Sequence, residues 1–208
     1  MLKLECRANG EFAGRPREEG ESWPHLLLGQ NIVSEDILTL DKLDKLNFRA
    51  KYRLVYAENL MSKLDFNSEL HGAQVHQFIT FKDKVSNDFI WFGIPFYEIR
   101  EPGLFPGYIG IDGGQDYASG KLIYTCSQDE FTNIKASSKQ WLEYDTDLLP
   151  LVKNAFNQAQ KMGIFSNAKI ENIHPTSTNV GWEMFGECNG AFEIKDLSLT
   201  GILKTSER

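Results

Sequence analysis

The stretch that most constrains the fold is residues 88–101, which read DFIWFGIPFYEIRE. In an extended conformation Phe89 and Trp91 lie on one side, and the even-numbered side chains on the other side are also apolar. A strand without a polar face is typical of a position covered above and below by other layers. The apolar run 89–96 is far shorter than the about 20 residues needed to cross a bilayer. It therefore predicts an interior strand of a β domain over 88–98.

A second strand is indicated at residues 46–56, where apolar and polar side chains alternate. The even-numbered side chains are all apolar or aromatic: Leu46, Phe48, Ala50, Tyr52, Leu54 and Tyr56. The odd-numbered ones are mostly basic, including Arg49, Lys51 and Arg53. This period of two predicts an antiparallel strand that buries its even-numbered face and exposes the basic row.

One helix is predicted at about 147–162, inserted among strands. Its apolar side chains recur at helical spacing: Leu148, Val152, Ala155, Phe156, Ala159 and Met162. Asp147 suits the N-cap, Pro150 the first turn and Gly163 a left-handed C-terminal cap. Shorter alternating or apolar runs predict the remaining strands, at 25–28, 37–40, 73–81, 108–112, 121–126, 169–173, 179–185 and 191–199.

The domain organisation follows from length and composition. Residues 1–24 are rich in Gly, Pro and charge and predict an irregular lead-in, and 25–208 predict a single β-sandwich domain without linkers or repeats. A chain of 208 residues suits one all-β domain, since such domains often reach roughly 200–250 residues. Folding at this length buries about 70% of the unfolded chain's surface, so the core needs no metal or disulfide.

The charge of the chain narrows the range of partners. A net charge of −7 argues against nucleic acid and against an anionic membrane surface, because both attract clustered Lys and Arg. The first residues, MLKLECRANGEF, lack the apolar stretch of a signal peptide. A cytoplasmic location is therefore expected unless a leader lies outside this chain.

The three cysteines are Cys6, Cys126 and Cys188, and their wide spacing matches no zinc-ligand pattern. Two interpretations stay open: one long-range disulfide plus a free thiol, or three unpaired and mostly buried thiols. The second is favoured, because free cysteine behaves as a small buried hydrophobe.

The most suggestive polar loop begins at Asp112 and runs through a glycine-rich turn. Gln115 and Asp116 lie on this turn beside Tyr117. Oxygen ligands at such a turn could hold calcium, with Asp112 and Asp116 as ligands. Asp-Gly-Gly is also ordinary hairpin chemistry, and no cofactor is expected. The chain contains no nucleophile-elbow, zinc-protease or phosphate-loop motif.

A second loop, 141–145, places Trp141 beside Glu143. A sugar ring offers C–H faces to flat aromatic rings and hydroxyls to carboxylate and amide groups. Trp141 or Tyr117 is thus predicted as a stacking platform. The hydroxyl partners are predicted to be Asp112, Gln115, Asp116 and Glu143. Since loops on a rigid sandwich commonly carry function, at least one of the two loops is expected to border the ligand groove.

The closing strands carry a resemblance to a known class. Residues 179–200, with NVGWEMFG, a turn and AFEIKDLSLTG, resemble the last strands of jelly-roll carbohydrate-binding modules of the galactose-binding-like or concanavalin-like kind. Apolar parity changes near 195–196, which predicts a β-bulge there. The resemblance covers about a tenth of the chain. It implies an all-β fold: an antiparallel two-sheet jelly-roll β-sandwich with one inserted α-helix.

Three functions follow as hypotheses. The preferred one is a non-catalytic glycan-binding module or accessory domain, of bacterial style, in a carbohydrate-active protein. The alternative is a sandwich-fold glycoside hydrolase or polysaccharide lyase, for which hydrolysis requires two carboxyls about 5–9.5 Å apart. Glu98, Glu143 and Glu183 are its candidate catalytic residues. A structural or protein-interaction domain is the further alternative.

Overall fold

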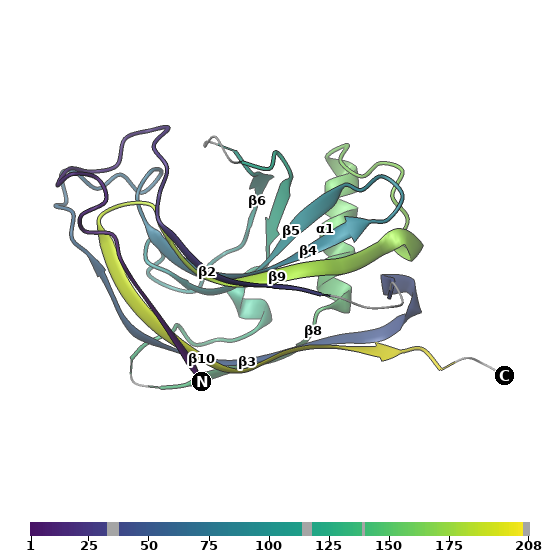
Figure 1. Cartoon of the computed structure of the whole chain (residues 1–208). Coiled ribbons are helices and arrows are strands. Elements are labelled where there is room, and N and C mark those ends of the chain that lie inside the picture. The colour runs from purple at the N-terminus through teal and green to yellow at the C-terminus, as the bar shows by residue number, and fades with distance from the viewer. Residues whose placement is uncertain (33–37, 114–117, 139, 206–208) are drawn as a thin grey trace.

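The computed structural model describes residues 1–32, 38–113, 118–138 and 140–205 (Figure 1). Its strands form two sheets. Sheet A has the order β1 (Leu2–Arg7), β10 (Cys188–Leu203), β3 (Leu43–Asn59) and β8 (Leu142–Asp147). Sheet B has the order β2 (His25–Asn31), β9 (Ile173–Met184), β4 (Ala73–Asp83), β5 (Phe89–Glu98), β7 (Leu122–Thr125) and β6 (Tyr108–Ile111).

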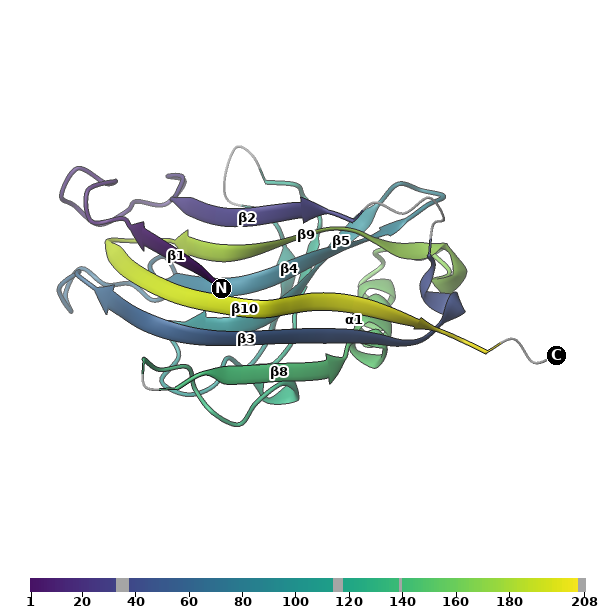
Figure 2. The ribbon, with the colours of Figure 1, turned by 60° about the horizontal axis from the view of Figure 1, so that its bottom comes forward.

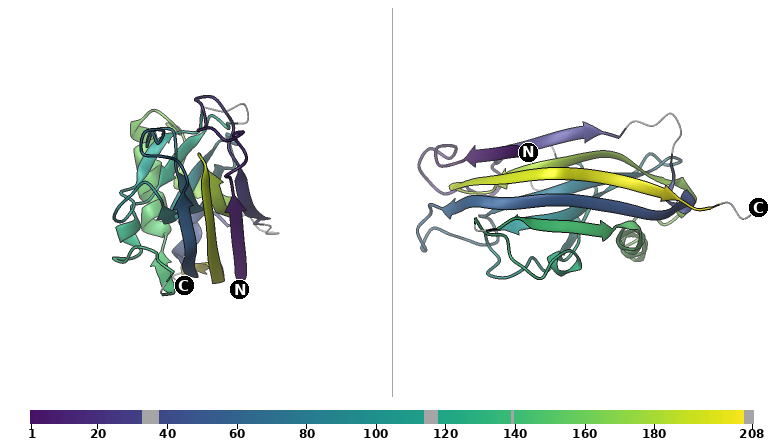
Figure 3. Two further views of the ribbon diagram at one scale, coloured as in Figure 1. Left: turned by 90° about the vertical axis from the view of Figure 1, so that its left-hand side faces the viewer. Right: turned by 90° about the horizontal axis from the view of Figure 1, so that it is seen from below.

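The two sheets lie face to face as layers (Figures 1 and 3). Figure 2 shows β1, β10, β3 and β8 side by side in front of sheet B. All strand pairs are antiparallel except β5 and β7, which are parallel. The prediction of an all-β, two-sheet jelly-roll sandwich with one helix is confirmed. No helix in the described part of the chain has the length and apolar character needed to cross a bilayer.

The alternation in β3 determines which of its two faces is buried, as predicted. Leu46, Phe48, Ala50, Tyr52 and Leu54 are buried and Tyr56 is half-buried. The basic row faces outward and pairs with acids of neighbouring strands: Arg49 with Asp145, Lys51 with Glu143 and Arg53 with Glu193. A one-residue slip would exchange these two faces, so burial of the apolar face fixes the register.

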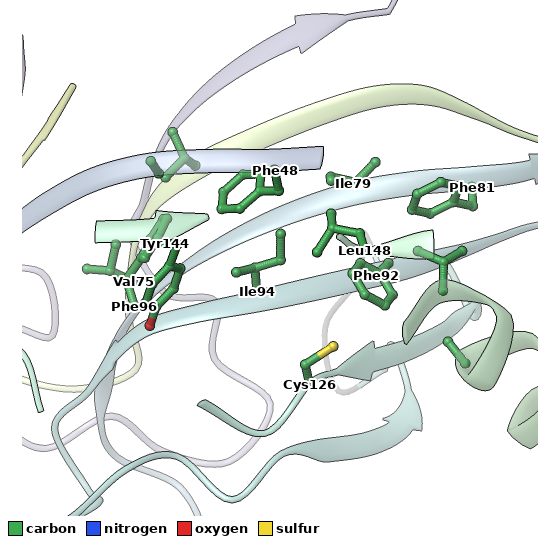
Figure 4. Close-up of a cluster of buried hydrophobic side chains, with 14 of the residues drawn as sticks. Phe48, Val75, Ile79, Phe81, Phe92, Ile94, Phe96, Cys126, Tyr144 and Leu148 are labelled. Carbon is green, nitrogen blue, oxygen red and sulfur yellow. The ribbon is translucent and has the colours of Figure 1, made fainter. Parts of the chain in front are cut away.

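The core between the sheets is rich in aromatic rings (Figure 4). Phe96 of β5 packs against Tyr52 and Tyr144 of sheet A, at ring-centroid distances of 4.5 and 5.3 Å. The buried Tyr144 hydroxyl donates to the Pro95 carbonyl at 2.8 Å and lies 2.9 Å from the Tyr52 hydroxyl. These contacts join β3, β5 and β8 across the two layers.

The helix α1 (Leu149–Lys161) lies within the predicted range and buries Leu149, Val152, Ala155, Phe156 and Ala159. Its N-cap is Leu148, not Asp147 as predicted. The Asp147 carboxylate instead accepts hydrogen bonds from the backbone N–H groups of Leu46 and Leu149, at 2.9 and 3.0 Å, and so joins the helix start to β3. Gly163 has the left-handed φ of +78° expected after a helix.

Several local predictions differ from the structure. The lead-in predicted as irregular over 1–24 includes strand β1, because Leu2–Arg7 pair with the open edge of β10. Residues 38–40 of the predicted strand 37–40 form no strand, and a 3₁₀ turn begins at Leu40. Another 3₁₀ turn, Ile170–Asn172, occupies most of the predicted strand 169–173. A third 3₁₀ turn covers Gln128–Glu130.

Two further sequence predictions agree with the structure. The register of β10 against β3 shifts between Lys195 and Ser198, as expected for a bulge near 195–196, and Asp196 in this stretch has a positive φ of 54°. Cys6, Cys126 and Cys188 are free thiols, and the last two are buried.

Candidate functional site

A cleft with a volume of about 740 Å³ lies on the face of sheet B that points away from sheet A. Its lining residues come from all six strands of sheet B and from the loops next to them. In Figure 1 strand β6 and the loop before β2 rise on this side of the sheet. The other face of sheet B points toward sheet A, and its side chains form part of the core.

The alternation of side chains in the strands produces this division. In β9, Val180 and Trp182 are buried in the core, whereas Asn179 and Glu183 line the cleft. In β5, Ile90, Phe92, Ile94 and Phe96 fill the core and Trp91 lines the cleft. The second apolar side of β5 was interpreted as covered by another layer. At Trp91 this interpretation is wrong, since the ring forms part of a cleft wall.

Glu183 is the most unusual acid of the cleft. It lies opposite His25 on β2 and Gln74 on β4, and its side chain is only 18% exposed. The Gln74 amide donates a hydrogen bond to its carboxylate, and His25 Nε2 lies 3.8 Å away. Burial raises the pKa of Glu183 above its ordinary value, the two neighbours partly oppose this, and the carboxylates of Asp112 and Glu98 add to the rise. Glu183 is therefore suited to hold and donate a proton.

Asp112 follows β6 at the edge of sheet B and lines the same cleft. Its Oδ2 accepts hydrogen bonds from the backbone N–H and the hydroxyl of Ser119, at 2.8 and 2.6 Å. The Trp91 indole in turn donates to the Ser119 hydroxyl at 3.0 Å. This chain of hydrogen bonds fixes the orientation of the Asp112 carboxylate relative to the aromatic wall.

Glu98 continues the row of Glu183 and Gln74 across the sheet, since it lies opposite Gln74 on β5. It is buried, and Arg100 holds both of its carboxylate oxygens through Nε at 2.8 Å and a terminal nitrogen at 2.6 Å. The Arg100 side chain, which lines the cleft, covers the ring of Phe185 at 5.2 Å. Glu98 therefore serves to position Arg100.

Aromatic rings form much of the remaining wall: Trp23, Phe78, Trp91, Phe105, Tyr108 and Phe185. Phe78 and Trp91 meet edge to face with centroids 6.3 Å apart, as do Trp23 and Phe185 at 5.0 Å. Sequence reasoning did not single out these rings. The signal that could have found Trp91 is the second apolar face of residues 88–98, which was assigned to a covering layer and not to a cleft.

The structure does not bring the described members of the predicted site together. Asp112 lines the cleft, but Trp141 lies on the outer face of sheet A, between Lys195 and Arg53 at 4.3 and 5.1 Å from its ring. Glu143 lies on the same outer face, 3.4 Å from Lys51. The reason is that β8, which contains Glu143, belongs to the other layer. Gln115, Asp116 and Tyr117 lie outside the described residues.

The calcium hypothesis rests on Asp112 and Asp116, and only Asp112 is described. In the described ranges no group of three or more His, Cys, Asp or Glu side chains gathers as a metal site would require. The Asp112 carboxylate accepts its two hydrogen bonds from Ser119.

Comparison with known proteins shows which solved structures have a similar fold. No protein-family model and no curated protein sequence matches the chain. Among solved structures, the endoglucanase cel12A from Rhodothermus marinus is similar with a TM-score of 0.50 at 10% identity, over 95% of this chain and 79% of that one. The xyloglucanase domain of NopAA from Sinorhizobium fredii gives a TM-score of 0.46 at 12% identity, over 86% and 76%. The family 11 xylanase from Neocallimastix patriciarum gives 0.44 at 10%, over 89% and 79%.

The class defined by this likeness is the jelly-roll β-sandwich. The expected resemblance to jelly-roll sandwiches is thus correct in its coarse form. The endoglucanase from Rhodothermus marinus is a glycoside hydrolase, and the galactose-binding-like and concanavalin-like kinds named from the closing strands find no support in this likeness. At such low identity the likeness extends to the fold alone.

Proposed function

We propose that the protein is a sandwich-fold glycoside hydrolase whose active site is the cleft on sheet B. The observation that carries this proposal is the presence in one cleft of two carboxyls with different surroundings, Glu183 and Asp112. Hydrolysis of a glycosidic bond uses such a pair, one as an acid and the other as a base or nucleophile. This function replaces the binding module that the sequence favoured.

The different surroundings of Glu183 and Asp112 indicate a different catalytic role for each. Glu183 is largely buried and its pKa is raised above the ordinary value, which favours the protonated form that the leaving sugar oxygen requires. Asp112 is the second carboxyl, kept in place by Ser119 for attack on the sugar or for activation of water. Phe78 of β4 and Trp91 of β5 line the cleft on strands that lie between β9 and β6, and they offer aromatic surface to a sugar. Two carboxyls in such different environments can take the separate roles of general acid and of base or nucleophile.

A survey of substrates tests the proposal. Since the endoglucanase from Rhodothermus marinus shares the fold, cello-oligosaccharides are the first probes, followed by xyloglucan and xylan. Release of new reducing ends by the purified chain is the expected result. Saturable binding without release would favour the glycan-binding module instead, and the absence of both would contradict either carbohydrate function.

A pH profile tests the role of Glu183 through its neighbour Gln74. The Gln74 hydrogen bond favours the charged carboxylate and therefore lowers the pKa of Glu183. In Gln74→Met this pKa rises further, so the general acid stays protonated to higher pH. We expect the alkaline limb of the kcat/KM profile on cellotetraose to move to higher pH than in the wild type. An unchanged or acid-shifted limb would be inconsistent with Glu183 as the acid.

A further inference from the structure

His76 lies on the cleft floor with an imidazole that has no hydrogen-bond partner. It belongs to β4, is 3% exposed and lines the cleft. Neither Nδ1 nor Nε2 has a partner among the residues that the structure describes. Its ring neighbours are Phe78 and Phe105, with centroids 5.7 and 5.2 Å away, and neither side chain can accept or donate an ordinary hydrogen bond. A buried polar group normally has a hydrogen-bond partner, so the two unpartnered nitrogens of this imidazole indicate a position where a ligand binds.

The strand register places His76 beside the proposed acid. The residue directly opposite it on β9 is Gly181, which has no side chain. Asn179 and Glu183 flank Gly181 on the same face of β9, and each is therefore a diagonal neighbour of His76. Asn179 Oδ1 is also buried and unpartnered within the described ranges. His76 is thus the unsatisfied group next to Glu183, and Asn179 lies on the other side of His76, four residues from Glu183 along β9.

The chemistry of these groups selects the kind of ligand. Burial, with a smaller effect of the Arg100 charge, lowers the pKa of His76 to about 3, so the imidazole is neutral at neutral pH. A neutral imidazole presents one N–H donor and one acceptor nitrogen, and the Asn179 oxygen adds a second acceptor. A hydroxyl group, which both donates and accepts, matches this set, whereas a carboxylate or phosphate would meet two acceptors.

We propose that His76 and Asn179 form a subsite that recognises ring hydroxyls of a neutral sugar next to Glu183, with His76 as the residue that determines specificity. The identification of the ligand as a sugar rests on the proposed function.

Binding measurements on an inactive background test this subsite. In Glu183→Gln, the additional change His76→Phe is expected to raise the Kd for cellotetraose about 10-fold, the effect of losing a hydrogen bond whose polar partner stays buried. His76→Gln, which keeps a donor and an acceptor, is expected to recover part of the affinity. The matched control is His174→Phe, which changes a histidine of β9 that does not line the cleft and should leave the Kd unchanged.

Two further readouts separate recognition from structure. Replacing an unpartnered buried imidazole with an apolar ring should leave the melting temperature equal or higher, whereas a structural role would lower it. In Glu183→Gln with His76 intact, saturating cellotetraose should shift the ¹⁵N resonances of His76 and not those of His174. Cellotetraose binding that is unaffected by His76→Phe, with no ¹⁵N shift, would overturn the subsite and leave the proposed function standing. Failure of the wild type to bind or cleave any of the glycans would overturn both.

Discussion

Glu183→Gln is expected to lower kcat/KM for cellotetraose by about 10³-fold, within the range that general acid catalysis supplies. Glutamine keeps the size of the side chain and can still contact Gln74, but it cannot release a proton to the leaving oxygen. The measurement is the initial rate of reducing-end release at the wild-type pH optimum, with the Kd for cellotetraose measured on the same variant. The Kd should change far less than the rate.

The matched control for this prediction is Glu143→Gln. Glu143 was an equal candidate in the sequence, but its side chain lies beside Lys51 on the outer face of sheet A. This variant should hydrolyse cellotetraose at the wild-type rate. Equal activities of the Glu183 and Glu143 variants would remove Glu183 from the mechanism.

Phe96→Ala is expected to reduce the free energy of unfolding by about 3–5 kcal/mol, the usual effect of removing a buried phenylalanine ring. Phe96 is 1% exposed and packs between Tyr52 and Tyr144, so the change opens a cavity between the two sheets. Urea unfolding followed by tryptophan fluorescence measures the loss. Because β5 contributes to both the core and the cleft, hydrolysis should weaken along with stability.

An exposed apolar residue provides the control. Leu64 is 98% exposed, and Leu64→Ala should leave the urea midpoint within experimental error of the wild type. A loss for Phe96→Ala as small as that for Leu64→Ala would contradict the position of Phe96 between the sheets.

The sheets could be predicted from the sequence because a period of two is a local property. Alternation in 46–56 identified the buried face of β3, and the parity change near 195–196 identified the bulge in β10. The start of β9 was missed because residues 174–178 are polar. Their pairing is supported by hydroxyls that meet across strands, such as Thr80 with Thr176 and Ser177.

The site could be predicted only in part, because it depends on which strands become neighbours. Glu183 and Asp112 were both among the named candidates, yet nothing local to either indicates that β9 and β6 border one cleft. Trp141 has an aromatic ring and nearby acids, the same local signal as a sugar platform. Its position on the outer face of sheet A is decided by the pairing of β8 with β3, which local sequence does not encode.

The most direct test of the account is a crystal structure of Glu183→Gln with cellotetraose. We predict a sugar chain in the cleft on sheet B, with a glycosidic oxygen within hydrogen-bond distance of the substituted side chain and a ring hydroxyl on the His76 imidazole. A sugar bound instead at Trp141 on the outer face of sheet A, with the cleft empty, would contradict it.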